Sequence, residues 1–277
     1  SVNHEIIAVA GEAGAREVDR PCCSAMRPLE HALAARGTLV LDGALATELE
    51  RRGFDLNDPL WSARVLLDAP DAIRAVHRDY FEAGADIATS ASYQATFQGF
   101  AARGLSRASA REMLLLSVRL ACEARDEFCA KAPTRARPLV AASIGSYGAY
   151  LADGGEYLGD FALDENALVA FHRERVEVLA ASAADVLAFE TIPCLAEARA
   201  LARLASEVAH KEAWLSFSCR DARTNSNGES IAACMAELDA SAALTAVGVN
   251  CTAPHLIAEL VREIASSTRK PIVVYPN

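Results

Sequence analysis

Four polar residues of the sequence stand directly after apolar stretches that resemble buried strands: Asp42, Glu190, Asn250 and Cys251. A carboxylate next to a buried strand costs several kcal/mol unless it is paired with a cation or bound to a ligand. Asp42 and Glu190 together could therefore hold an ammonium group. Each carboxylate alone is more typical of a helix cap or a structural ion pair, so the pair carries the prediction.

Cys251 is a candidate metal ligand, although a cysteine beside an apolar strand is more often a small core residue. His255 follows four positions later, but a helix that begins at Pro254 would turn its side chain outward. The eight cysteines are scattered and form no Cys-X-X-Cys pair. In a long chain this is typical of free thiols in a reducing compartment, so we expect a cytoplasmic protein.

The apolar stretches recur along the chain and are separated by helical patterns. Since they are nearly continuous rather than alternating, they are typical of strands covered on both faces, as in parallel sheets. Seven strand–helix units predict an α/β fold, namely a (β/α)8 TIM-type barrel whose eighth βα unit is missing from the sequence. A doubly wound open sheet is the alternative, although it more often carries a glycine-rich phosphate turn. The expected strands are 38–41, 86–90, 139–144, 186–189, 213–217, 246–249 and 272–275.

Residues 1–25 are expected to lie outside the domain that the rest of the chain forms. Residues 1–25 contain four acidic residues and lack the basic start and apolar centre of a signal peptide. We interpret them as a leader outside the fold, and residues 26–277 as a single barrel domain truncated at its C-terminus.

Two long connections, 146–160 and 220–230, follow strands and would lie on the catalytic face of a barrel, unless they are plain surface loops.

The charge of the chain narrows the classes of partner. The 277 residues are 52% hydrophobic and carry a formal net charge of −10. An acidic chain lacks the basic face that attracts nucleic acids or anionic membranes, and no apolar run reaches the ~18 residues of a membrane span. We therefore expect small-molecule partners, no nucleic acid and no membrane, and the sequence leaves the oligomeric state open.

The strand ends belong to longer motifs that resemble the homocysteine S-methyltransferase family, and within it the branch that uses S-methylmethionine or S-adenosylmethionine. The resemblance runs from about Thr38 to Asn277. Any one motif could occur by chance, but all of them in this order are specific. They are LDGALATEL (41–49), GADIATSASYQAT (84–96), GSYGAY (145–150) with GGEY (154–157), FETIP (189–193), GVNCT (248–252) and VYPN (274–277).

The resemblance implies a (β/α)8 barrel with a Zn2+ ion held by three cysteine thiolates. Cys251 matches the first ligand, and the other two match an adjacent pair in a Gly-Gly-Cys-Cys motif that is expected after Asn277. Cys22 and Cys23 precede the first expected strand, so they cannot be assumed to replace that pair. We therefore expect these 277 residues alone to bind zinc poorly and to be inactive.

The activity that the resemblance implies is transfer of a methyl group from a sulfonium donor to the thiol of homocysteine, which gives methionine. By the same matching, Asp42 and Glu190 orient the amino-acid part of homocysteine, and Asn250 is a neighbouring substrate-site residue. Zinc lowers the pKa of the thiol, because only the thiolate attacks well. The donor leaves as a neutral thioether, so the enzyme mainly has to align the reacting atoms.

Four aromatic residues, Tyr93, Tyr147, Tyr150 and Trp61, are candidate walls for the sulfonium cation or ordinary packing residues. Two other functions also stay open. One is a degenerate, non-catalytic barrel that binds amino acids or partners. The other is a barrel lyase or aldolase, although no expected strand ends in the lysine that a Schiff base needs. The methyl donor and the choice between homocysteine and selenocysteine are not predicted.

Overall fold

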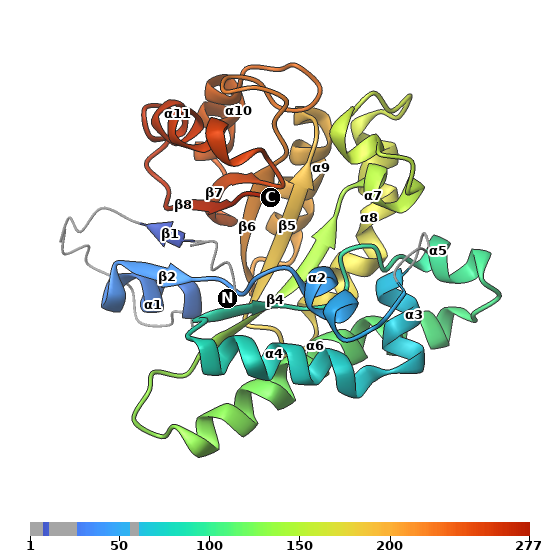
Figure 1. Ribbon diagram of the computed structural model, residues 1–277. Helices are drawn as coiled ribbons and strands as arrows, with labels where there is room; N and C mark the ends of the chain where they lie inside the picture. Colours follow the sequence, from blue (N-terminus) through green and yellow to red (C-terminus); the bar gives the residue numbers. More distant parts are fainter. Residues whose placement is uncertain (1–7, 11–26, 56–60) are drawn as a thin grey trace.

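The computed structural model describes residues 8–10, 27–55 and 61–277. They form an α/β fold around a curled, mostly parallel sheet (Figure 1). The strands are β1 (Ala8–Ala10), β2 (Thr38–Val40), β3 (Ile87–Thr89), β4 (Leu139–Gly145), β5 (Val186–Ile192), β6 (Glu212–Phe217), β7 (Leu244–Asn250) and β8 (Ile272–Tyr275). Each of the seven stretches predicted as strands overlaps one strand, although β4 to β7 extend beyond the predicted bounds.

The strands follow the order β2-β1-β8-β7-β6-β5-β4-β3. All neighbours from β3 to β8 pair in parallel, whereas β1 pairs antiparallel with both β2 and β8. A parallel bridge between Leu41 and Ile87 also links the end of β2 to β3, and the Asp42 amide donates to the Ile87 carbonyl at 2.8 Å. The carboxyl ends of β2 and of the strands from β3 to β8 therefore lie at one edge of the curled sheet.

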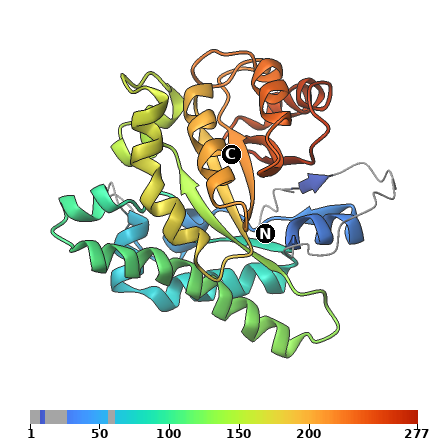
Figure 2. The same cartoon turned by 180° about the vertical axis from the view of Figure 1, so that it is seen from behind.

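The helices lie outside the sheet, and Figure 2 shows α8 and α9 in front of the strands. Local sequence explains many of their limits, because proline occupies the first turn of α1, α4 and α11, and Gly84 ends α4 with a φ of 121°. Within the described residues, no helix is long and apolar enough to cross a membrane. They are α1 (Pro28–Arg36), α2 (Leu45–Arg51), α3 (Trp61–Asp68), α4 (Pro70–Ala83), α5 (Phe97–Ala102), α6 (Arg107–Lys131), α7 (Tyr147–Leu151), η1 (Gly155–Tyr157), α8 (Glu165–Ala180), α9 (Leu195–Glu207), α10 (Ile231–Asp239) and α11 (Pro254–Ala265).

The N-terminal stretch is described only at Ala8–Ala10, which forms β1 between β2 and β8. The rest of residues 1–25 lies outside the described residues. The expectation that this stretch is a leader apart from the fold stays a prediction.

The strands have two buried faces, and each face belongs to a different core. Outward residues such as Val140, Leu187 and Leu215 pack with the helices in one large cluster. Alternate residues point inward, because side chains of a strand alternate between its faces. These inward residues form a second, smaller cluster: Leu39, Leu41, Ile87, Leu139, Ala141, Val186, Ala188, Trp214, Ala246 and Val273, joined by Leu29 and Leu33 of α1. This apolar plug fills the inside of the sheet below its carboxyl edge.

Candidate active site

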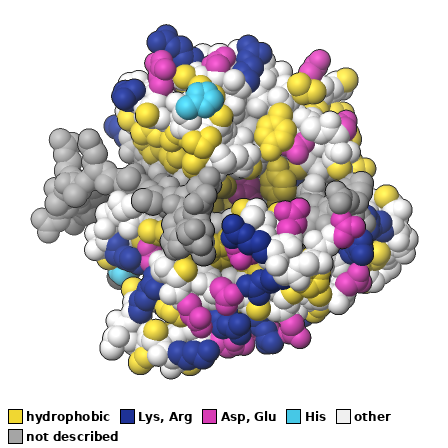
Figure 3. Space-filling view, in the orientation of Figure 1, with side chains coloured by type: hydrophobic (Ala, Val, Ile, Leu, Met, Phe, Trp, Pro, Cys, Tyr) yellow, Lys and Arg dark blue, Asp and Glu magenta, His cyan; other side chains and the backbone are white. Residues whose placement is uncertain are grey.

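A layer of polar side chains lies above the apolar plug, and the alternation along the strands puts it there. On β5, Val186 and Ala188 belong to the plug, and Glu190 is the next residue on the same face. On β4 and β8 the same step leads from Ala141 to Ser143 and from Val273 to Tyr275. Figure 3 shows acidic and hydrophobic side chains around a hollow on this side of the molecule.

Glu190 is a buried carboxylate that accepts hydrogen bonds from neutral hydroxyl groups. Its side chain is 8% exposed. The Ser143 hydroxyl donates to Oε1, and the Tyr275 hydroxyl donates to Oε2 at 2.7 Å. Burial raises the pKa of Glu190 above its ordinary value, although these hydrogen bonds lower it. The two hydroxyl groups thus hold the carboxylate in place, and no Lys or Arg of the described residues forms an ion pair with it.

Asp42 is the second buried carboxylate of the layer. Thr89 donates to it twice, from its amide to Oδ2 and from its hydroxyl to Oδ1, both at 2.9 Å. Burial raises the pKa of Asp42 to about 8, and the negative charge of Glu190 adds to the rise while the Thr89 hydrogen bonds oppose it. His77 Nδ1 lies 3.8 Å from Oδ2, but burial lowers the pKa of His77 to about 4, so this imidazole is neutral at pH 7.

Asn250 ties the ends of three strands together. Its Oδ1 accepts from the Thr191 amide and from the Ser216 hydroxyl, each at 2.7 Å, and its Nδ2 donates to the Thr191 hydroxyl at 2.7 Å. The side chain is 1% exposed. Thr191 has a φ of 58°, a left-handed conformation that a β-branched residue rarely adopts. The Asn250 carboxamide holds this strained turn directly after Glu190.

Cys251 follows Asn250 and does not point into apolar packing. Its backbone also has a positive φ, 46°, and its amide donates to the Tyr275 carbonyl at 3.0 Å. Burial raises the pKa of the Cys251 thiol and the Glu190 charge raises it too, whereas hydrogen bonds with Thr191, Asn250 and Tyr157 lower it. The thiol therefore faces the polar layer that contains Glu190, and Glu190 in turn acts on Asp42.

The aromatic residues predicted to surround the sulfonium cation divide into two groups. Tyr147 and Tyr150 pack against each other and against Phe171, with ring centroids 4.9 to 5.8 Å apart, so their contacts are those of core packing. Tyr93 lies near Cys251, because the charges of Cys251 and Glu190 contribute to its raised pKa, after the larger effect of burial. The side chain of Trp61 lies outside the described residues.

Both long connections predicted for the catalytic face lie at the carboxyl edge. The first, after β4, contains α7 and η1, and the second, after β6, contains a turn at Asn227. The two connections meet, because a Cβ added at Gly159 would lie 3.0 Å from the Asn227 Cβ. The Ser218 hydroxyl, directly after β6, also donates to the Glu156 carbonyl at 2.8 Å. The Asn227 amide donates to the Pro193 carbonyl at 3.0 Å, which anchors the second connection beside β5.

Comparison with known proteins assigns this arrangement to a family. Residues 39–277 match the sequence model of the family described as homocysteine S-methyltransferase. The chain belongs to this family. It is 52% identical over 255 residues to the homocysteine S-methyltransferase YbgG of Bacillus subtilis. The aligned region covers 91% of this chain and 81% of that protein.

Other relatives act on related acceptors or have solved structures. The selenocysteine Se-methyltransferase of Brassica oleracea var. italica is 52% identical over 252 residues, or 87% of this chain and 73% of that protein. The homocysteine methyltransferase MmuM of Escherichia coli, in its metallated form, is 46% identical with a TM-score of 0.86, covering 89% of this chain and 86% of that chain. The chain is thus a methyltransferase with the α/β fold and curled sheet of this family.

A metal site for this homocysteine S-methyltransferase family member is not complete among the described residues. The Cys251 thiol is a soft donor of the kind that zinc prefers. The described residues contain no group of three His, Cys, Asp or Glu side chains that could hold a metal ion. Cys22 and Cys23 lie outside the described residues. His255 is exposed at the start of α11, as predicted, and supplies no ligand at the site.

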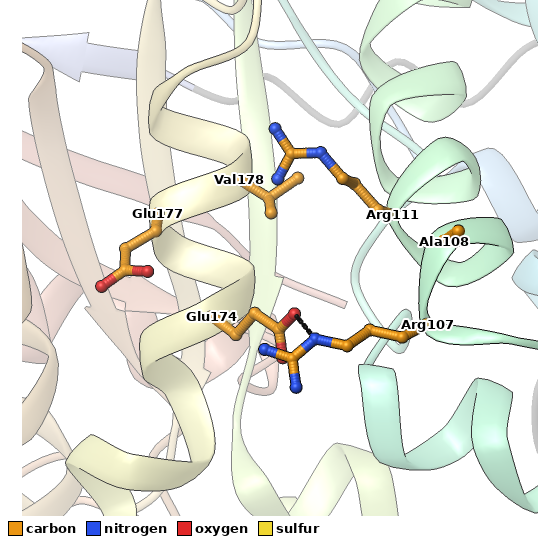
Figure 4. A pocket seen from close by; sticks show the side chains of 6 residues that line it. All are labelled: Arg107, Ala108, Arg111, Glu174, Glu177 and Val178. Atoms are coloured by element: carbon orange, nitrogen blue, oxygen red, sulfur yellow. Dashed lines mark ion pairs between the residues drawn. The ribbon is translucent and has the colours of Figure 1, made fainter.

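A second hollow lies on the outside of the molecule between α6 and α8, away from the carboxyl edge (Figure 4). Arg107 and Glu174 form an ion pair of 2.7 Å across it, and the Arg107 side chain is 79% exposed. Charges this exposed are ordinary surface groups. The hollow therefore has no part in the methyltransferase site.

The sequence prediction omitted several members of the polar layer. Tyr275, Ser143 and Ser216 are inside strands rather than after them, so a search for polar residues at strand ends passes over them. The signal that would find them is their alternation with the inward apolar residues, for example Trp214 before Ser216. Thr191 gave no signal, because its role depends on a backbone conformation.

Proposed function

We propose that this family member transfers a methyl group from a sulfonium donor, S-methylmethionine or S-adenosylmethionine, to the thiol of homocysteine in a zinc-dependent reaction. One observation carries the proposal. Two buried carboxylates, Asp42 and Glu190, share the layer with the Cys251 thiol, and no Lys or Arg of the described residues forms an ion pair with either. A ligand ammonium is the cation that this pair lacks.

In this proposal Asp42 and Glu190 bind the ammonium group of homocysteine. An ammonium between them offsets their mutual repulsion and restores the charged form of both, which burial disfavours. Ser143, Thr89 and Tyr275 keep the carboxylates in fixed rotamers, so the substrate is oriented when it arrives. The homocysteine thiol then extends toward Cys251, and methionine is the product.

The transfer itself is a displacement at carbon. The thiolate sulfur forms a bond to the methyl carbon, the bond from that carbon to the donor sulfur breaks, and the donor leaves with the electron pair as a neutral thioether. Cys251 is the one proposed zinc ligand among the described residues. Zinc, when bound, would lower the pKa of the substrate thiol. The other two ligands are expected in the cysteine pair after Asn277.

The finer description of fold and location also belongs to the proposal. We infer a (β/α)8 barrel of residues 26–277, in which an eighth βα unit is expected after Asn277. The parallel bridge from Leu41 to Ile87, which links β2 to β3, supports a closed arrangement. We expect the protein to work in the cytoplasm, where a reducing compartment keeps Cys251 as a thiol.

The test uses the full-length protein, with any residues that its gene encodes after Asn277, loaded with zinc. We expect methionine to form from homocysteine and S-methylmethionine or S-adenosylmethionine, and activity to be lost in Cys251→Ala. A matched control is Cys129→Ala, since Cys129 is a free cysteine on the outer helix α6. Absence of turnover with both donors would refute the proposal.

A further inference from the structure

The connection after β4 brings Tyr157 to Cys251, and Glu156 directly precedes this tyrosine. Tyr157 of η1 hydrogen-bonds with the Cys251 thiol, and its side chain is 46% exposed. The Oε2 atom of Glu156 is buried without a hydrogen-bond partner. A buried carboxylate oxygen without a partner is costly, so its retention calls for a ligand that supplies one.

The Glu156 carboxylate lies within electrostatic range of two tyrosines that also interact with Cys251. Its negative charge contributes to the raised pKa of both Tyr93 and Tyr157, after larger effects that include burial. Burial also raises the pKa of Glu156 itself. Two tyrosines and one unmatched carboxylate therefore lie near the thiol, in addition to Glu190.

The backbone of this segment is fixed, so the carboxylate does not depend on a mobile loop. The Ser218 hydroxyl holds the Glu156 carbonyl at 2.8 Å. Gly148 of α7 packs so closely that an added Cβ would lie 2.2 Å from the Glu156 nitrogen. The Gly155 amide is held by the Asp153 carboxylate at 2.9 Å. The position of Glu156 is thus set before any ligand binds.

We propose that Glu156, together with the rings of Tyr157 and Tyr93, recognises the positive charge of the sulfonium donor and so determines the specificity for a cationic methyl donor. This inference rests on the proposed function. A carboxylate and ring faces attract a sulfonium cation, and they attract the neutral thioether product much less. The donor loses its charge as the methyl group leaves, so Glu156 stabilises the bound donor more than the transition state. Its removal should therefore raise KM for the donor and leave kcat nearly unchanged or slightly higher.

The experiment compares wild type, Glu156→Gln and Asp160→Asn in the full-length, zinc-loaded enzyme. Asp160 is an exposed acid of the same connection and serves as the matched control. We expect Glu156→Gln to raise KM for S-methylmethionine about tenfold, with KM for homocysteine and kcat changed less than about threefold. Asp160→Asn should match wild type, and thermal melting verifies that each variant folds.

A second measurement tests charge recognition with a neutral ligand that cannot donate a methyl group. 2-Amino-5-methylhexanoate has the shape of S-methylmethionine with a neutral CH in place of the sulfonium. As a competitive inhibitor it should bind wild type and Glu156→Gln within about twofold of each other. An unchanged KM for S-methylmethionine in Glu156→Gln, or an equal loss of affinity for the neutral analogue, would overturn the inference while wild-type turnover leaves the proposed function intact. Inactive wild type would instead refute the proposed function.

Discussion

Buried or largely buried acids occur at both edges of the sheet, but they have different partners. At the amino edge, Asp86, Asp185 and Glu212 each accept from backbone amides and each lie near arginine. Asp185 pairs with Arg125 at 3.0 Å and with Arg137 at 3.3 Å. These acids cap the strands, and their charge is balanced within the protein.

At the carboxyl edge, Asp42 and Glu190 receive only neutral donors in the described part of the chain. Thr89 donates hydrogen bonds to Asp42, whereas Ser143 and Tyr275 donate to Glu190. His77, which lies near Asp42, is uncharged at pH 7. The difference separates structural acids from ligand-binding acids. An acid with its own arginine contributes to folding, whereas an acid without a cation costs stability and is retained for what it binds.

The largest effect is expected for Glu190→Gln, which keeps the shape of the side chain and removes its charge. We expect kcat/KM for homocysteine to fall about a thousandfold, because the ammonium loses a buried partner. Stability should be unchanged or higher, measured by urea unfolding. Glu50→Gln, which changes an exposed acid of α2, is the control and should retain wild-type kinetics. Wild-type kinetics in Glu190→Gln would contradict the claim that the acids of the carboxyl edge bind a ligand whereas those of the amino edge are structural.

The opposite pattern is expected for Asp185→Ala at the amino edge. Arg125, whose side chain is 6% exposed, would be left without its main buried partner. We expect the free energy of unfolding to fall by about 3 kcal/mol, while kcat/KM per folded molecule stays near wild type. Asp71→Ala, which removes an exposed ion pair with Arg74, should change stability by less than about 0.5 kcal/mol. A loss of stability no larger than that of Asp71→Ala would contradict the structural role of Asp185.

A smaller effect follows from the pKa of Asp42, about 8 in the absence of ligand. Below pH 8 the free protein holds a proton on Asp42 that ammonium binding must displace, so affinity should rise with pH toward 8. His77, with a pKa of about 4, and Tyr80, with a pKa of about 12, stay neutral in this range, whereas Glu190 shifts in the same direction as Asp42.

Norvaline, which has a methyl group in place of the homocysteine thiol, isolates this effect from thiol ionisation. Calorimetry should show its affinity for wild type rising about tenfold from pH 6 to pH 7. The rise should be much weaker in Asp42→Asn. A flat profile in wild type would mean that Asp42 is already ionised before the ligand binds.

The smallest effect is expected for Tyr157→Phe. The variant keeps the aromatic ring but removes the hydroxyl that hydrogen-bonds with Cys251. We expect kcat/KM to fall about threefold to tenfold, because a single hydrogen bond is lost. Tyr157→Leu should fall further, since it also removes the ring from the proposed sulfonium site. Equal kinetics for the two variants would exclude a role for the ring.

The sequence predicted the parts of this account that depend on local pattern. Seven apolar runs predicted the strands, and Asp42 and Glu190 stood out because a charged residue directly follows an apolar run. Parallel strands then bring such residues to one edge, so their proximity also follows from the pattern.

The remaining features depend on contacts between distant segments. Tyr275 reaches Glu190 across 85 positions of the chain, and this contact requires the curvature of the sheet. The left-handed backbone of Thr191 has no residue-type signal, since glycine or asparagine would be expected there. The pairing of Ala8–Ala10 with β2 and β8 likewise has no counterpart in the sequence pattern. Whether a carboxylate has an arginine partner is also decided by such contacts.

The most direct measurement compares two methyl acceptors in the zinc-loaded, full-length protein with S-methylmethionine as donor. Homocysteine and 4-mercaptobutanoate share the thiol and the carboxylate, but only homocysteine has an ammonium group. The account predicts that methionine forms from homocysteine. It also predicts that kcat/KM for 4-mercaptobutanoate is lower than that for homocysteine by a factor of about one hundred or more. Equal efficiency with both acceptors would contradict the claim that Asp42 and Glu190 hold the substrate ammonium.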